Sequence, residues 1–144
     1  MMPAKKDPAM LKRLDLRARI SALEATLLQL PQQEIEIRHQ FSGGMYARSM
    51  LAPAGALIVG GIYKKAHYVV LAFGRVTVIT ETEGEQHIKA PAMWAAPIGT
   101  KRVIQVFEDT LWTTIVATTA LTPEDAMADV IAKSFEDLEA VWSQ

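Results

Sequence analysis

The sequence predicts a mainly β protein, a single jelly-roll barrel with one helix before it and one after it. Three observations predict this fold. Between residues 34 and 120, short apolar runs alternate with turn residues, no helix-length segment interrupts them, and helical patterns flank them on both sides. Many short, evenly spaced strands are typical of a sandwich or barrel. The lack of helices between them argues against a parallel α/β sheet.

The length and composition of the chain indicate one domain. Half of its 144 residues are apolar, enough for one hydrophobic core and too few for two. We divide this domain into an N-terminal helical arm at 1–33, the barrel at 34–120, and a C-terminal helix at 121–144 that packs on the barrel.

The charge and the cysteine content narrow the classes of partner. The net charge is −1, so nothing indicates general attraction to nucleic acid or to an anionic membrane, and a nucleic-acid partner is not expected. The chain contains no cysteine, which excludes disulfides and thiolate metal sites and fits a reducing cytoplasm. The N-terminal residues lack the continuous apolar run of a signal peptide or membrane span. We therefore expect a cytoplasmic protein without a membrane partner.

The N-terminal helix is expected to begin at Asp7-Pro8, an N-cap residue followed by proline, and to end near Leu30 before Pro31. It carries a narrow apolar stripe with heptad-like spacing. Two explanations stay open: the stripe packs on the barrel of its own chain, or it forms a short coiled-coil seam between subunits. We expect a homo-oligomer, formed through the barrel or through the stripe residues Leu16, Ile20, Leu23 and Leu27.

The apolar period changes from helical to two at Glu34. Ile35, Ile37, His39 and Phe41 share one face of this first strand, so His39 is expected to point inward. Eight further strands are expected, bounded by glycine, proline or charged residues: Met45–Leu51, Ala56–Tyr63, His67–Phe73, Arg75–Thr82, His87–Ala90, Met93–Ala96, Thr100–Phe107 and Thr110–Ala117.

The C-terminal segment has the pattern of one helix. Thr122 is placed as its N-cap, with Pro123 in the first helical position and two acidic residues in the first turn. One apolar face is expected to dock on the barrel, made of Met127, Val130, Ile131, Phe135, Leu138 and Trp142.

Three motifs resemble the cupin superfamily over residues 53–117: PAG at 53–55, LAFG ending at Gly74, and PIGTKR at 97–102. The resemblance implies a jelly-roll barrel. In metal-binding cupins, two motifs anchored on the equivalents of Gly74 and Pro97 supply four ligand positions. Those positions correspond here to Gly61, Tyr63, His67 and Arg102, of which only His67 is a good metal ligand. The resemblance therefore predicts no metal cofactor, and a divalent metal, if one bound, would use His67.

A narrower resemblance is to small single-domain cupin-like proteins of tailed bacteriophages and prophages. It is carried by the GMYAR strand at 44–48, the PAG turn, the loop before His67, and PIGTKR with the later DTLWTT at 109–114. This resemblance implies a phage context, either in the cytoplasm of an infected or lysogenic bacterium or in the virion.

Strand parity gives an independent argument about a pocket. Arg102 shares its face with Ile104 and Val106, so this arginine points into the barrel if that face is inward. A charge in an apolar barrel is costly unless it is paired or holds an anion, and the planar guanidinium suits carboxylate or phosphate. We predict that a small anionic ligand, such as a nucleotide, is bound by Arg102, His67, Tyr63 and His39. In the alternative, Arg102 is structural and pairs at the barrel mouth with Glu108, Asp109 or Glu36.

No catalytic residue is assigned. Trp94 and Trp112 are interpreted as core residues rather than as stacking platforms, and no serine lies in a nucleophile motif. The leading hypothesis is a non-enzymatic binding or assembly module, which is either virion-associated or sequesters the anionic ligand. The alternative is a metal-dependent cupin enzyme of the isomerase or dioxygenase type, using His67 with His39 or His87.

Overall fold

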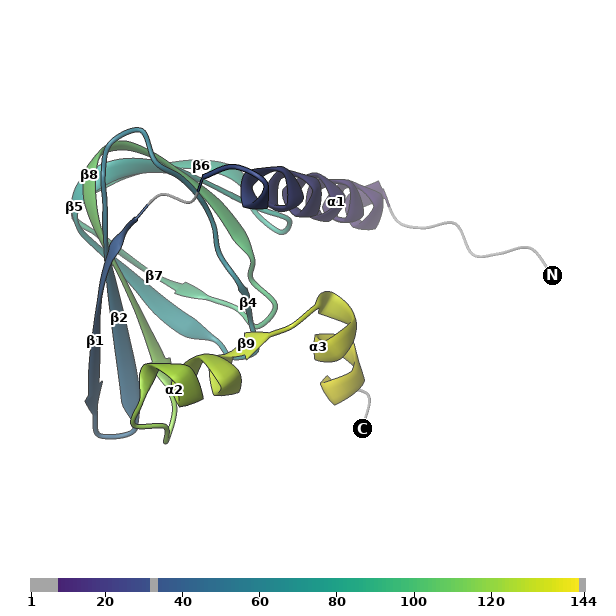
Figure 1. The fold of residues 1–144 in the computed structure, drawn as a ribbon. Helices are drawn as coiled ribbons and strands as arrows, with labels where there is room; N and C mark the ends of the chain where they lie inside the picture. Colours follow the sequence, from purple (N-terminus) through teal and green to yellow (C-terminus); the bar gives the residue numbers. More distant parts are fainter. Residues whose placement is uncertain (1–7, 32–33, 143–144) are drawn as a thin grey trace.

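The computed structural model describes residues 8–31 and 34–142, with side chains up to Leu138 (Figure 1). One long helix, α1 (Pro8–Leu28), precedes the strands, and Figure 1 shows all the helices gathered on one side of the bent sheet. The other elements are β1 (Glu36–Ser42), β2 (Met45–Ala52), β3 (Leu57–Val59), β4 (Ile62–Tyr63), β5 (His67–Thr80), β6 (Gly84–Lys89), β7 (Ala92–Ala96), β8 (Arg102–Ala117), α2 (Pro123–Val130), β9 (Ile131–Ala132) and α3 (Phe135–Trp142).

The barrel is built on two long antiparallel strands, β5 and β8, which pair along nearly their whole length. The first half of β5 and the second half of β8 form one layer with β1, β2 and β7. The remaining halves form the other layer with β3 and β6. The layers meet where the long strands bend, and their other ends form an open mouth. The prediction of a mainly β jelly roll flanked by helices is confirmed.

The bend lies where Gly74 crosses Thr110. Gly74 has φ +107°, and a Cβ placed on it would lie 2.6 Å from the Thr110 Cα. Register shifts occur on both sides of this glycine. We expected strand breaks at Gly74 and at Glu108-Asp109, but both long strands continue through these positions. Bulges at this crossing, where glycine has no side chain, let β5 and β8 bend together while their backbone hydrogen bonding continues on both sides.

The main core fills the space between the two layers near the bend. Trp112 is 3% exposed there, and the half-buried Trp94 ring meets it edge-on at a centroid distance of 5.4 Å. Both tryptophans are therefore packing residues, as predicted. The buried members of this core are Met50, Ala52, Ala56, Val69, Leu71, Val76, Val78, Ile104, Val106 and Trp112.

The C-terminal segment differs from the single helix that we expected. Thr122 does cap α2, since its hydroxyl accepts a hydrogen bond from the Asp125 N–H, but α2 ends at Val130. Ile131 and Ala132 then pair with β4 as strand β9, and Ser134 caps a separate helix, α3.

The helical period across this segment was a correct signal of burial, because Val130 and Leu138 are 1% and 3% exposed. The free edge of β4 offers backbone hydrogen bonds that a helix at 131–132 could not use. The side chain of Trp142 lies outside the described residues.

Helix α1 packs on the barrel of its own chain. It begins at Pro8 as predicted, and Asp7 lies outside the described residues. Ile20 is buried against the barrel, whereas the other stripe residues are at most half-buried. Contacts between subunits through this stripe stay a prediction. None of the helices in the described ranges is long and apolar enough to cross a membrane.

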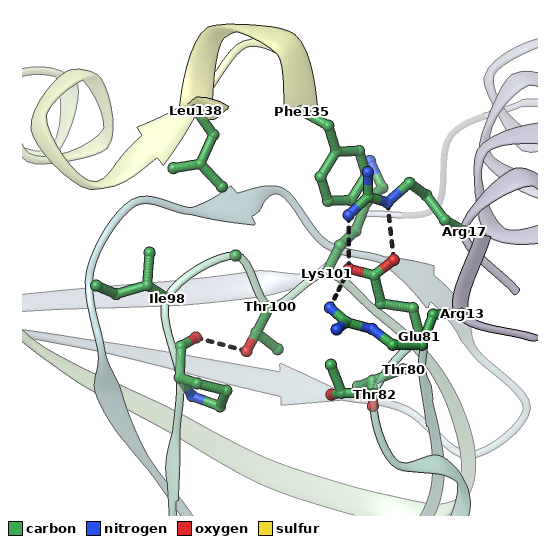
Figure 2. A pocket seen from close by; sticks show the side chains of 12 residues that line it. Arg13, Arg17, Thr80, Glu81, Thr82, Ile98, Thr100, Lys101, Phe135 and Leu138 are labelled. Atoms are coloured by element: carbon green, nitrogen blue, oxygen red, sulfur yellow. Dashed lines mark hydrogen bonds and ion pairs between the residues drawn. The ribbon is translucent and has the colours of Figure 1, made fainter. Parts of the chain in front are cut away.

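Ion pairs also fix α1 in place (Figure 2). The Arg17 guanidinium donates two hydrogen bonds, of 2.7 and 2.9 Å, to the carboxylate of Glu81, which is 7% exposed. Arg13 approaches the same carboxylate at 3.5 Å, and Lys101 donates to Glu24 at 2.8 Å. Helix α1 covers this lysine and leaves it 7% exposed.

Candidate functional site

A cavity of about 350 Å³ opens at the mouth of the barrel, between the two layers. Its walls come from β1, β2, β3, β4 and β8 and from the C-terminal segment. The lining residues are Ile35, Ile37, Arg48, Met50, Ile58, Val59, Gly60, Gly61, Tyr63, Arg102, Ile104, Trp112, Thr114, Met127 and Ile131. The lining contains two arginines and no acidic residue.

Arg102, the first residue of β8, is 4% exposed and points inward as predicted. Its Nη2 donates a hydrogen bond of 2.8 Å to His67 Nε2, which bridges the two layers at the mouth. This is the one hydrogen bond that the described residues offer its guanidinium. No described side-chain nitrogen is both buried and unbonded, so the other nitrogens of Arg102 reach accessible space.

Burial lowers the pKa of Arg102 to about 10, and the nearby Tyr63 and Glu83 oppose this change. Arg102 therefore remains a cation at neutral pH. The exposed Glu83 acts on it only from a distance, without forming an ion pair.

His67, the first residue of β5, is held as a neutral imidazole of one tautomer. Because Arg102 can only donate, Nε2 must accept, and the ring proton therefore lies on Nδ1. Nδ1 donates to the carbonyl oxygen of Lys65 at 3.0 Å. Burial, and then the charge of Arg102, lower the pKa of His67 to about 4, despite the opposing hydrogen bond to Lys65. At neutral pH, His67 is thus an acceptor that orients Arg102.

Two aromatic rings hold the guanidinium of Arg102. Tyr63 stacks on His67 at a centroid distance of 3.9 Å. The Arg102 Cζ lies 5.6 Å from the centre of the Tyr63 ring and 5.5 Å from the centre of the Trp112 ring. Such cation–π contacts restrict the guanidinium without neutralising its charge.

Arg48 is the second cation of the cavity, and our sequence reasoning missed it as a site residue. This half-buried residue of β2 lines the cavity from the opposite layer. Within the described ranges, its side chain has no hydrogen bond or ion pair. The alternation of the strand was the available signal. Tyr46, Arg48 and Met50 lie on the same face of β2, and Tyr46 and Met50 are buried.

The carboxylates that we considered as partners of Arg102 are engaged elsewhere. Glu108 lies 3.5 Å from Arg75. The other two accept hydrogen bonds from a backbone N–H at Ala54 and from Arg38: Asp109 at 2.9 Å and Glu36 at 2.8 Å. Among the described residues, no acidic side chain pairs with Arg102, so the predicted pairing with Glu108, Asp109 or Glu36 is wrong.

His39 does not join the predicted cluster. It lies on the expected face of β1, but it is exposed, and its Nδ1 is hydrogen-bonded to the hydroxyl of Tyr46. Tyr46 packs in the same buried cluster as Tyr63, which leaves His39 at the margin of the site. Of the four residues predicted from the sequence, Arg102, His67 and Tyr63 come together.

The residues at the cupin ligand positions do not fit a metal ion. A Cβ placed on Gly61 would lie 2.8 Å from the Ile131 Cγ2, so β9 fills the space that a ligand side chain would need. Arg102 is a cation, and His67 Nε2 already accepts its hydrogen bond. His87 is exposed on β6 and bonds Thr77. Among the described residues, no three histidine or acidic side chains are grouped in a way that could hold a metal.

Comparison with solved structures identifies the fold. The chain is similar to an RmlC-like cupin family protein with a double-stranded β-helix fold from Methanocaldococcus jannaschii, with TM-score 0.51 and 12% identity over 60% of this chain and 83% of that one. It is also similar to KdgF from Halomonas sp., with TM-score 0.52 and 15% identity over 65% and 90% of the two chains. A third similar structure is the cupin domain of Cnp3 from Schizosaccharomyces pombe, with TM-score 0.50 and 18% identity over 65% and 68%.

These likenesses show that the chain has the cupin fold, as the sequence motifs implied. No family model and no curated protein matches the sequence. At identities this low the likeness shows the fold alone, and one fold supports many functions.

Proposed function

We propose that this chain is a non-enzymatic binding protein whose barrel holds a small organic anion between Arg48 and Arg102. One observation carries this proposal: two guanidinium groups line the same cavity, and no described carboxylate pairs with either of them. An uncompensated charge in an apolar setting costs several kcal/mol, on the order of the buried-ion penalty. An anion would supply the missing charge, and arginine binds carboxylate or phosphate through two parallel hydrogen bonds.

Binding is favoured over catalysis because the titratable group at the mouth is already engaged. His67 uses Nδ1 on a backbone carbonyl and Nε2 on Arg102, so neither ring nitrogen is left to take a proton from a substrate. The metal-dependent isomerase or dioxygenase is therefore the weaker alternative. The absence of a suitable set of metal ligands among the described residues supports this ranking.

Native mass spectrometry of the gently purified protein tests the proposal, with Arg102→Met and Arg48→Met as variants. Arg75→Met is the matched control, because Arg75 is exposed and pairs with Glu108 away from the cavity. We expect an anionic adduct in the wild type and the control, and its loss in the two cavity variants. A metal-sized adduct near one per chain would support the enzyme. No adduct, and no rise in melting temperature with phosphate, citrate, benzoate or octanoate, would overturn the proposal.

We also propose a phage context for this binding role, on the sequence resemblance alone. The protein would act in the cytoplasm of an infected or lysogenic bacterium, or be carried in the virion. Mass spectrometry of purified virions, compared with lysate from the same infection, separates the two locations. A chain found only in the lysate supports the cytoplasmic role, whereas a chain found in virions at a constant number of copies supports assembly.

A homo-oligomer remains part of the proposal. The outer face of β5 and β7 supports it, since Tyr68 and Met93 are 53% and 68% exposed on neighbouring strands. The same native mass spectra report the number of subunits. If Tyr68→Lys dissociates the oligomer, the barrel face forms the interface. If only Leu23→Lys does so, the interface is the helical stripe.

A further inference from the structure

The walls of the cavity restrict the ligand further than its charge does, and this step rests on the proposed function. We infer that the ligand is amphipathic: one carboxylate or phosphate head group on an apolar body of about ten non-hydrogen atoms. The side chains around the two arginines separate this class of ligand from sugars and nucleotides.

The polar side chains of the cavity are its two arginines, Tyr63 and Thr114. Thr114 already accepts a hydrogen bond of 3.2 Å from Trp112 Nε1, and the Gly60 N–H donates to the backbone carbonyl of Arg102 at 3.0 Å. A sugar or a nucleotide carries many hydroxyl and ring donors and acceptors. Most of them would lose water in this cavity without gaining a partner, which is costly for each group.

The remaining walls are aliphatic and come from several strands. Ile37, Met50, Ile58 and Ile104 face the cavity from β1, β2, β3 and β8. Ile131 of β9 covers them from the C-terminal segment. Such walls gain free energy by covering methylene or ring carbons, in proportion to the apolar area removed from water.

The size of the cavity sets the length of the apolar body. Its volume of about 350 Å³ corresponds to about a dozen non-hydrogen atoms, at the roughly 30 Å³ that a water molecule occupies in the liquid. Octanoate and phenylpropionate have this size. Acetate and inorganic phosphate would fill only the region between the two arginines.

Isothermal titration with four probes tests the head group and the body separately: acetate, octanoate, inorganic phosphate and octyl phosphate. We expect octanoate or octyl phosphate to bind at least 100-fold more tightly than the matching short anion. The comparison of these two long probes assigns the head group. Octanol is the uncharged control and should bind at least 10-fold more weakly than the better long anion.

Two variants locate the two halves of the ligand. Arg102→Met should lower the affinity for every anion, whereas Ile37→Gln, on the half-buried wall of β1, should weaken only the long ones. Equal affinities of short and long anions, still lost in Arg102→Met, would overturn the amphipathic ligand and leave the anion site standing. Octanol binding as tightly as octanoate, or no binding of any probe, would overturn the proposed function itself.

Discussion

Lys101 and Arg102 are neighbours in the chain, are buried to similar degrees, and have opposite electrostatic surroundings. Lys101 lies beneath α1 and donates to Glu24, beside a second carboxylate, Glu81, that Arg17 and Arg13 neutralise. Arg102 faces the cavity, and its one hydrogen bond among the described residues is to the neutral His67. Charges that hold a helix on a barrel need their partners within the chain. Arg102, a charge without such a partner among the described residues, is the observation that supports the proposed anionic ligand.

The largest expected effect is the pH dependence of the free energy of unfolding that His67 causes. The unfolded chain binds a proton on this imidazole with the ordinary pKa of 6.5, whereas the folded chain binds it only at about 4. Between these values the unfolded state holds more protons, so this contribution to stability is complete above pH 6.5 and is lost as the pH falls toward 4. The loss is at most about 3.5 kcal/mol, at about 1.4 kcal/mol for each pKa unit.

Urea denaturation of the wild type and of His67→Gln at pH 7, 5.5 and 4 measures this contribution. The glutamine keeps an acceptor for Arg102 and does not titrate. Other carboxylates change protonation in both proteins, so the difference between the two curves isolates His67. Parallel curves would show that this imidazole is not held neutral.

The next largest expected effect concerns the ion pairs that hold α1 on the barrel. Glu81→Gln removes the charge that receives Arg17 and Arg13, and it should lower the free energy of unfolding by about 2 kcal/mol, the scale of a hydrogen bond to a charged group. Glu85→Gln is the control, because Glu85 is an exposed carboxylate and should change stability by less than about 0.5 kcal/mol. Chemical denaturation of both variants checks this. Equal stabilities would mean that α1 is held by apolar contacts alone.

The smallest expected effect on stability comes from replacing Lys101 and Arg102 themselves. Lys101→Met should destabilise the ligand-free protein by about 1 kcal/mol, because it leaves the partly buried Glu24 without its cation. Arg102→Met should change the stability by less than that, since removing an uncompensated charge offsets the lost hydrogen bond to His67. Both are measured by urea denaturation of dialysed protein. A clear loss of stability in Arg102→Met would indicate a structural arginine.

The fold was predictable to the extent that its signals are local. Alternation, turn residues and capping locate most strands and the start of each helix, and parity correctly directs Arg102 into the barrel. The break in the C-terminal helix was not predictable, because its cause is the free edge of β4, about 70 residues earlier in the chain. The strand alternation shows which face of the strand Arg48 shares, but it does not show that no carboxylate pairs with this arginine. That is a property of the folded structure, and for this reason Arg48 was missed.

Strand β9 has a consequence for the timing of synthesis. Ile131 lines the cavity and pairs with Tyr63. The segment from α2 to β9, which supplies Met127 and Ile131, follows all the other walls in the chain. A ribosome that has made residues 34 to 117 has completed both layers of the barrel, with the side of the cavity at Gly61 still uncovered. The proposed ligand site is therefore complete only after the last part of the domain is translated.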